Sequence, residues 1–297
     1  MIRAAAAALF AMLTAGCATI GAFNRSTPHD SGVVHAATSV RYGAGERRTL
    51  DVYVPESRPN RAPVIVFFYG GGWSSGAKGD YSFAGDAFAA QGFVTFVPDY
   101  RVYPEVRFPG FVEDAASALR WVQANASRYG GDPERIVLVG HSAGAHIAML
   151  TALDSRYAEA AEFDRASVRG VVGIAGPYGF DNFNMPLLRN VFGEAEEPMA
   201  TMPVQFASSD GPPLLLLHGD RDARVPVRSS TRMYEVATQA GQAAEIKIYP
   251  GIDHPGIMQA IALARRNEAP VLRDVVDFAR RVTGMQVATT PPPTGTR

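Results

Sequence analysis

The stretch Arg135-Ile136-Val137-Leu138-Val139-Gly140-His141-Ser142-Ala143-Gly144 decides the fold of this chain. A short apolar run ends in a serine that has glycines two residues before and two residues after it, and residues 145–153 have helical composition. This G-x-S-x-G pattern is typical of a strand, a sharp turn and a helix, with the serine hydroxyl exposed at the turn. Glycines are needed because a Cβ would clash where strand and helix approach. The pattern predicts Ser142 as a strained nucleophile; the alternative is an ordinary helix N-cap.

Outward from this turn, apolar segments alternate with segments of helical pattern. Strands are expected at 38–42, 49–54, 64–69, 93–97, 136–139, 168–174, 214–217 and 245–249. Helices are expected at 80–91, near 111–122, after Ser142, near 229–240 and near 269–282. Such β-α alternation with fully apolar strands implies an α/β fold, with a mostly parallel sheet covered by helices on both faces.

Composition excludes several classes of function. The chain has 297 residues and a net charge of -1, without a basic patch, so nucleic acid is not an expected partner. Its single cysteine, Cys17, allows no intrachain disulfide and no thiolate metal site. Histidine spacings of the H-x-x-H or H-E-x-x-H kind are missing. We therefore expect neither a metal nor another cofactor.

The first 17 residues are typical of a targeting segment. Arg3 precedes an apolar run that is too short for a comfortable membrane span, as in a signal peptide. The run ends in Leu13-Thr14-Ala15-Gly16-Cys17, which resembles a bacterial lipobox, although Thr14 departs from the usual leucine. The resemblance implies lipidation of Cys17 and, with Ala18 after it, an outer-membrane lipoprotein facing the periplasm or the cell surface. The alternative is ordinary cleavage near residues 15–18 and a soluble periplasmic protein.

A nucleophilic serine needs a general base oriented by a carboxylate, in the chain order Ser, Asp or Glu, His. Five of the six histidines lie in places less suited to a base: His29, His35, His141, His146 and His218. His254 alone comes late, in a loop directly after the last expected strand. We therefore assign His254 as the base.

The acid should follow the preceding strand, where Asp220 and Asp222 compete. The spacing H-G-x-x-D-x-x-V-P places Asp222 past the turn and before the next helix, so Asp222 is preferred. Asp220, nearer the strand end, is expected to be a turn residue that hydrogen-bonds its own backbone.

The segment Tyr69-Gly70-Gly71-Gly72-Trp73 follows the first central strand. Consecutive glycines allow backbone amides to converge on one point, where they would stabilise a developing oxyanion. We expect the amides of Gly71, Gly72 and Ala143 to form this oxyanion hole. The alternative is a plain flexible turn.

These motifs together resemble the α/β-hydrolase superfamily, closest to esterases with H-G-G-G-[FW], D-Y-R-x-x-P-E and G-x-S-A-G. That group includes hormone-sensitive-lipase-like carboxylesterases and kynurenine-formamidase-like hydrolases. The matching segments are Tyr69 to Trp73, Asp99 to Glu105, Gly140 to Gly144, Asp222 and His254. One departure is Tyr69 in place of the usual histidine, which leaves the rigidity of the glycine loop open. Asp99 and Arg101 are expected to form a buried pair that braces this loop.

The resemblance implies an α/β-hydrolase fold and a serine carboxylesterase acting on small to medium acyl esters. Hydrolysis of an aryl formamide, or of an acetylated or feruloylated carbohydrate, is the alternative, and a catalytically idle envelope scaffold is a third hypothesis. Residues 176–212 are the expected lid or acyl-pocket wall, with Trp73, Tyr178 and Phe180 at the pocket, unless these apolar residues only plug the core. The expected domain covers residues 36–286, after a linker at 18–35 and before a disordered tail at 287–297.

Overall fold

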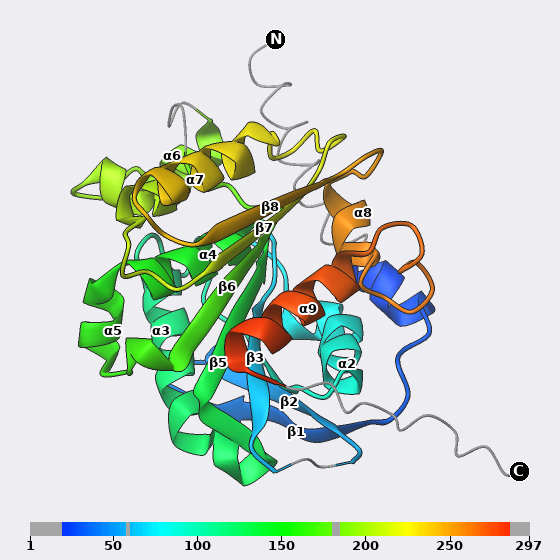
Figure 1. The fold of residues 1–297 in the computed structure, drawn as a ribbon. Helices are drawn as coiled ribbons and strands as arrows, with labels where there is room; N and C mark the ends of the chain where they lie inside the picture. Colours follow the sequence, from blue (N-terminus) through cyan, green and yellow to red (C-terminus); the bar gives the residue numbers. More distant parts are fainter. Residues whose placement is uncertain (1–19, 58–59, 180–184, 286–297) are drawn as a thin grey trace, which may run out of the picture.

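A computed structural model of the chain describes residues 20–57, 60–179 and 185–285 (Figure 1). Within these ranges eight strands form one sheet in the order β1-β2-β4-β3-β5-β6-β7-β8. The strands are β1 (Val33–Arg41), β2 (Thr49–Pro55), β3 (Ala62–Phe68), β4 (Val94–Pro98), β5 (Gly131–His141), β6 (Val168–Ile174), β7 (Leu214–Gly219) and β8 (Ala244–Tyr249). The pairs β1–β2 and β2–β4 are antiparallel and all other neighbouring pairs are parallel. The mostly parallel sheet that the sequence predicts is confirmed.

Helices cover both faces of this sheet (Figure 1). The α-helices with defined bounds are α2 (Ser82–Ala90), α3 (Gly110–Asn125), α4 (Ala143–Leu153), α5 (Ser155–Ala161), α6 (Pro186–Phe192), α7 (Arg228–Gln239), α8 (His254–Gln259) and α9 (Val271–Thr283). Short 3-10 helices are η1 (Lys78–Tyr81), η2 (Ala126–Tyr129), η3 (Arg165–Ser167), η4 (Pro198–Thr201) and η5 (Pro203–Phe206). Figure 1 shows α2 and α9 on one face and α3, α4 and α5 on the other.

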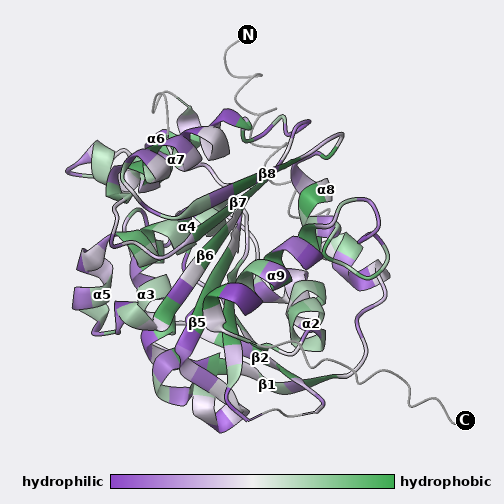
Figure 2. Ribbon diagram, viewed as in Figure 1, coloured by the Kyte–Doolittle hydropathy of each residue, from purple (hydrophilic) through white to green (hydrophobic). Residues whose placement is uncertain are grey.

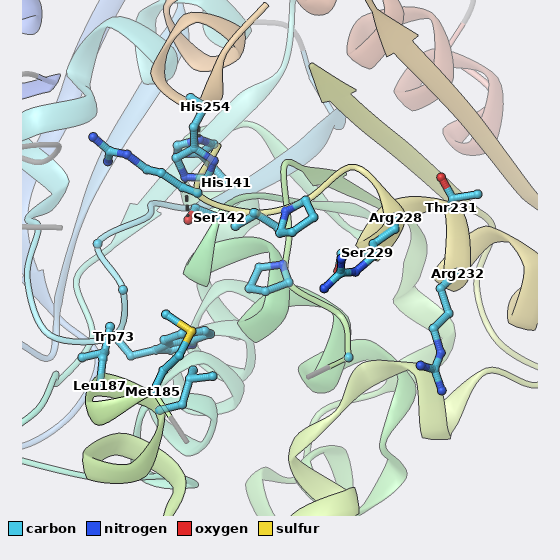
Figure 3. Close-up of a pocket in the computed structure, with 18 of the residues that line it drawn as sticks. Trp73, His141, Ser142, Met185, Leu187, Arg228, Ser229, Thr231, Arg232 and His254 are labelled. Atoms are coloured by element: carbon cyan, nitrogen blue, oxygen red, sulfur yellow. Dashed lines mark hydrogen bonds between the residues drawn. The ribbon is translucent and has the colours of Figure 1, made fainter. Parts of the chain in front are cut away.

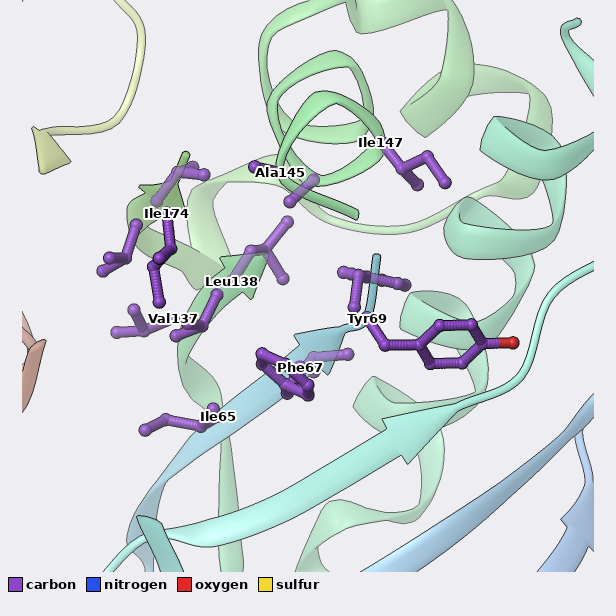
Figure 4. Packing of buried hydrophobic residues seen from close by; sticks show 14 of the residues in the cluster. Ile65, Phe67, Tyr69, Val137, Leu138, Ala145, Ile147 and Ile174 are labelled. Carbon is purple, nitrogen blue, oxygen red and sulfur yellow. The ribbon is translucent and has the colours of Figure 1, made fainter. Parts of the chain in front are cut away.

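The core lies between the central strands and these helices. Every residue of β3, β4 and β7 is buried, and so is every residue of α4, which is why these segments are largely apolar (Figure 2). Figure 4 shows Leu138 of β5, Ile174 of β6 and Ala145 of α4 within this cluster. The nucleophile therefore lies between β5, whose last six residues are buried, and the fully buried helix α4.

The expectation that residues 18–35 form a linker is wrong for the part of this range that the structure describes. Residues 20–26 are helical, and β1 begins at Val33. Ile20 is 2% exposed, and Asn24 accepts a hydrogen bond of 3.0 Å from the amide of Phe83. These buried contacts dock the segment on the domain, which sequence composition does not indicate.

Two histidines of the same segment also contact the domain. His29 and His35 lie 2.5 and 2.7 Å from the two carboxylate oxygens of buried Asp86 in α2. The expected signal peptide with Cys17, and the expected tail at 287–297, lie outside the described residues. Among the helices that the structure does describe, none is both long and apolar enough to cross a bilayer.

Candidate active site

Ser142 lies at the turn between β5 and α4, with φ 54° and ψ -121°. This is a strained backbone conformation for a residue with a side chain. A Cβ on Gly144 would lie 2.1 Å from the carbonyl oxygen of Phe68, and one on Gly140 would lie 2.3 Å from that of Gly144. The two glycines are therefore required where helix and strands meet. The steric reason that the sequence suggested for the G-x-S-x-G pattern is present in the fold.

The structure brings Ser142 together with His254 and Asp222, as the sequence predicts. His254 Nε2 lies 2.9 Å from Ser142 Oγ, and His254 Nδ1 lies 2.6 Å from Asp222 Oδ2. The ring comes from the first residue of α8, directly after β8, and is 6% exposed. Because the carboxylate accepts a hydrogen bond from the Nδ1–H group, Nε2 is left to accept the proton of the serine hydroxyl.

Asp222 is held as an anion by four donors. Its Oδ1 accepts from the amides of Arg224 and Val225, both at 2.9 Å, and its Oδ2 accepts from His254 and His218. Burial alone raises the pKa of Asp222, but the hydrogen bonds from His218 and His254 outweigh burial and hold it well below its usual value. Asp222 is therefore charged at neutral pH and orients the imidazole of His254.

His218 is a residue of this site that the sequence analysis missed. Its Nε2 lies 3.2 Å from Asp222 Oδ2 and 2.9 Å from the carbonyl oxygen of Val225, and its Nδ1 lies 2.7 Å from Ser230 Oγ. The signal was present in the i, i+4 spacing of the H-G-x-x-D pattern. The competing carboxylate, Asp220, accepts from the amide of Gly251 at 2.7 Å and so braces the turn after β8. It bonds a distant amide instead of its own backbone.

The glycine loop after β3 runs beside the nucleophile. Gly71 and Gly72 have φ values of +151° and +59°, and a Cβ on Gly71 would lie 2.0 Å from the carbonyl oxygen of Ser75. A Cβ on Gly70 would lie 3.0 Å from Cβ of Ser142. The loop can approach the serine this closely only with glycine. The oxyanion-hole role of Gly71, Gly72 and Ala143 stays a prediction.

Tyr69 anchors this loop through a polar network. Its hydroxyl donates to Asp99 Oδ1 at 2.7 Å and accepts from Arg47 Nη2 at 3.0 Å. The expected pair between Asp99 and Arg101 is wrong, because Arg101 instead binds Asp114 with Nη2–Oδ1 at 2.7 Å. Asp99 instead accepts the hydrogen bond of Tyr69, the residue at the position where the pattern usually has histidine.

Two further buried histidines surround the triad. His141 donates from Nε2 to the carbonyl oxygen of His254 at 3.2 Å, and burial lowers its pKa to about 3. His146 donates from Nε2 to the carbonyl oxygen of Thr201 at 2.7 Å and accepts from the indole N–H of Trp73 at 3.3 Å. Burial lowers the pKa of His146 to about 4. Both rings are therefore neutral positioning groups at physiological pH.

Ser142 and His254 open into a cavity of about 750 Å³ (Figure 3). Its apolar wall is formed by Ile20, Trp73, Met185, Leu187 and Leu188. Trp73 thus lines the cavity, whereas Phe180 lies outside the described residues. Parts of the segment that was expected as a lid, 176–212, are folded into α6, η4 and η5.

The expectation that Tyr178 lines the pocket is wrong. Tyr178 is fully buried, and a Cβ on Gly173 of β6 would lie 1.9 Å from its hydroxyl oxygen. Its neighbours Pro177 and Gly179 line the cavity in its place. Phe192 is also buried, with its ring centroid 4.9 Å from that of Trp73. Tyr178 and Phe192 of this segment therefore pack into the core, whereas Met185, Leu187 and Leu188 of the same segment line the cavity.

Comparison with known proteins gives one family model, BD-FAE, which matches residues 50–236. A protein of Oryza sativa subsp. japonica, named probable isoprenylcysteine alpha-carbonyl methylesterase ICMEL1, is 35% identical over 73% of this chain and 56% of its own length. Esterase LipC of Mycobacterium tuberculosis is 34% identical over 72% of this chain and 58% of its own length. The chain thus spans little more than half the length of these curated relatives.

Solved structures give the same fold. Esterase B from Lactobacillus rhamnosis, inhibited by a tributyrin phosphonate, superposes with a TM-score of 0.80 at 21% identity, over 94% of this chain and 96% of that one. Thermogutta terrifontis esterase 2 superposes with a TM-score of 0.67 at 28% identity, over 86% and 94% of the two chains. The same esterase has been solved with propionate and with butyrate bound. The expected α/β-hydrolase fold is confirmed.

Proposed function

Because this chain belongs to the BD-FAE family of α/β-hydrolases, we propose that it is a serine carboxylesterase acting on small to medium acyl esters. The observation that carries the proposal is the continuous relay from Ser142 Oγ through His254 to Asp222, with spacings of 2.9 and 2.6 Å, at the floor of an open cavity. A serine with such a base and such a carboxylate is an activated nucleophile.

In the acylation step, Ser142 Oγ forms a bond with the ester carbonyl carbon while His254 Nε2 takes the hydroxyl proton. The carbonyl oxygen becomes an oxyanion, which we assign to the amides of Gly71, Gly72 and Ala143. Each such donor typically contributes about a hundredfold in rate. The imidazolium that forms is stabilised by Asp222, which stays ionised because its pKa is held low.

The intermediate collapses when the bond between carbonyl carbon and alkoxy oxygen breaks. His254 then donates its proton to the departing alcohol, which leaves an acyl ester on Ser142. A water molecule, deprotonated by the same imidazole, attacks the acyl group and releases the carboxylic acid. Both half-reactions thus use one base, in agreement with the single histidine within reach of Ser142 Oγ among the described residues.

The cavity supports the choice of acyl group. A volume of about 750 Å³ with an apolar wall suits a short or medium acyl chain. The similar proteins support carboxylic esters as substrates: the rice protein is named a probable methylesterase, and the Thermogutta esterase has been solved with propionate and with butyrate bound.

The test uses p-nitrophenyl esters from acetate to long chains with the purified protein and its Ser142→Ala variant. We expect hydrolysis that peaks at short or medium chains and falls by about a millionfold in the variant, because the triad acts as a unit. Stoichiometric labelling by a fluorophosphonate without turnover of any ester would redirect the proposal to an aryl formamide or a carbohydrate acetyl or feruloyl ester. If the protein showed no turnover of any ester and no labelling, the esterase proposal would be overturned in favour of a catalytically idle scaffold.

We also propose that the protein is exported and anchored by a lipid on Cys17, on the strength of the lipobox-like sequence alone. Fractionation of cells that express the full chain and a Cys17→Ala variant tests this. The native chain should sediment with the outer membrane, and the variant should not. Retention of the variant in the membrane fraction would overturn the proposal, and a native chain found in the soluble periplasm would favour ordinary signal cleavage.

A further inference from the structure

The cavity has a second wall that the proposed reaction does not use. It is formed by α7 and the loop before it, and Arg224, Arg228 and Arg232 all line it. Figure 3 shows Arg228 and Arg232 on one side of the cavity and Trp73 and Leu187 on the other, with Ser142 nearer to the apolar side. Glu235 is the one acidic residue among the described residues that line the cavity, so this wall is net positive.

The arginines face the cavity because of how α7 is seated. Ser230, Met233 and Ala237 are the buried residues of this helix. Residues 228, 232, 235 and 239 line the cavity along the helix at spacings of three and four. The burial of one face of α7 therefore fixes the charged face toward the cavity.

Two of these arginines are not neutralised by the protein. Elsewhere, arginines bind carboxylates closely, as in Arg101–Asp114 at 2.7 Å and Arg266–Asp30 at 2.8 Å. In the described part of the chain, neither Arg224 nor Arg232 has an acidic group within ion-pair distance, and both are exposed.

The charge of Arg224 also reaches the catalytic centre. Burial is the main reason that the pKa of His141 falls to about 3, and the positive charge of Arg224 contributes in the same direction. His141 itself lines the cavity beside Ser142. Because Arg224 lines the same cavity as Ser142, an anionic group bound there would share that cavity with the ester.

We propose that the preferred substrate of this site is an ester that carries an anionic group, a carboxylate, phosphate or sulfate, bound by Arg224 and Arg232. The proposal rests on the proposed esterase function and refines its substrate class. Guanidinium groups suit such anions because their planar donors match two oxygens at once. The apolar wall with Trp73 and Leu187 takes the uncharged chain of the same substrate.

Binding of a group remote from the reacting atoms acts alike on the ground state and the transition state. The arginines should therefore act mainly on KM, with kcat little changed. Because both arginines are exposed, the preference should weaken as added salt screens their charge.

The experiment compares esters that differ only in charge, with the whole protein. The first pair, mono-p-nitrophenyl adipate and p-nitrophenyl hexanoate, places the carboxylate on the acyl side. The second pair, 4-butyryloxybutanoate and butyl butyrate, places it on the alcohol side. In at least one of the two pairs, we expect kcat/KM to be about tenfold higher for the anionic ester than for the neutral ester. A tenfold difference corresponds to one charge-assisted contact.

The variants are Arg224→Gln, Arg232→Gln and the double variant. Arg221→Gln is the matched control, because Arg221 is an exposed arginine of the same loop that does not line the cavity. The double variant should lose the preference through a higher KM for the anionic ester. Hydrolysis of the neutral ester reports separately on any change at Asp222, whose Oδ1 accepts from the main-chain amide of residue 224. The control should keep the preference.

Equal kcat/KM within both pairs, with the neutral esters well hydrolysed, would overturn the inference and leave the esterase function standing. If the double variant kept the preference for the anionic ester, the inference would also be overturned, because another group would then bind the anion. Loss of turnover on all four esters, together with failure of fluorophosphonate labelling, would overturn the esterase function, and the inference with it.

Discussion

His141 Nε2 lies 3.2 Å from the backbone carbonyl oxygen of His254, so the residue before the nucleophile holds the loop that carries the base. The two rings also lie close, with centroids 5.0 Å apart. Since burial keeps His141 neutral, this contact is the same throughout the working pH range. It is a contact across 113 residues that fixes where the imidazole of His254 stands.

We expect His141→Leu to lower kcat by roughly ten- to a hundredfold, because a base displaced by about 1 Å loses that much. Ser142 and His254 remain, so KM should change little. His141→Gln keeps an N–H donor and should recover part of kcat. Steady-state kinetics of both variants check this. Equal loss of kcat in both would argue that the ring packing, and not the hydrogen bond, positions the loop.

Asp222→Asn should lower kcat by about ten-thousandfold while the fold is retained, because an amide no longer holds His254 in the catalytic tautomer. The matched control is Asp220→Asn, two residues away, whose carboxylate binds the amide of Gly251 and not the imidazole. Single-turnover kinetics on one ester measure both. A large loss in the control and a small loss in Asp222→Asn would reverse the assignment of the acid.

Buried imidazoles predict that stability falls in mild acid. Burial lowers the pKa of His141 to about 3 and that of His146 to about 4, whereas an unfolded histidine has a pKa of about 6.5. Between these values the unfolded chain binds protons that the folded chain does not bind, so the free energy of unfolding decreases as pH falls. The low pKa of Asp222 adds a further loss only below about pH 4, where the unfolded carboxyl becomes protonated.

Urea unfolding followed by tryptophan fluorescence checks this pH dependence. The midpoint should drop steadily from about pH 7 to about pH 4. His146→Leu removes one titrating group and should reduce the slope of midpoint against pH, whatever it does to the midpoint at neutral pH. A midpoint that is constant over this range would contradict the prediction.

Gly144→Ala should lower the free energy of unfolding by roughly 3 kcal/mol, because the new Cβ would lie 2.1 Å from the backbone oxygen of Phe68 and something must move. Gly79→Ala is the control, since nothing lies within 4 Å of a Cβ at that position. Denaturant titration of both variants measures the difference. Equal stability of the two variants would show that strand and helix approach less closely than the structure indicates.

Leu187→Trp should shift the acyl preference toward acetate, because a larger side chain in the apolar wall shortens the space beside Ser142. Met199→Trp is the control, because Met199 is 55% exposed on η4 and does not line the cavity. Rates across a series of p-nitrophenyl esters check this. An unchanged chain-length profile in Leu187→Trp would place the acyl chain elsewhere in the cavity.

The sequence by itself determined the elbow, the triad and the class of fold. Each depends on local rules: a strand that ends in glycine, serine and glycine must turn sharply, and alternating strands and helices must form a parallel sheet. The loops after parallel strands meet at the same edge of that sheet. Chain order alone was therefore enough to bring His254 and Asp222 to Ser142.

Only the tertiary structure decided which side chains meet across the molecule. That Arg101 binds Asp114, that Tyr178 packs into the core and that Ile20 reaches the cavity depend on the packing of distant elements. The wall formed by Arg224, Arg228 and Arg232 also depends on this packing, because in the sequence these charges are scattered and form no patch. A periodic pattern fixes the direction of a side chain within its own element, but its partners are fixed only when several elements pack against one another.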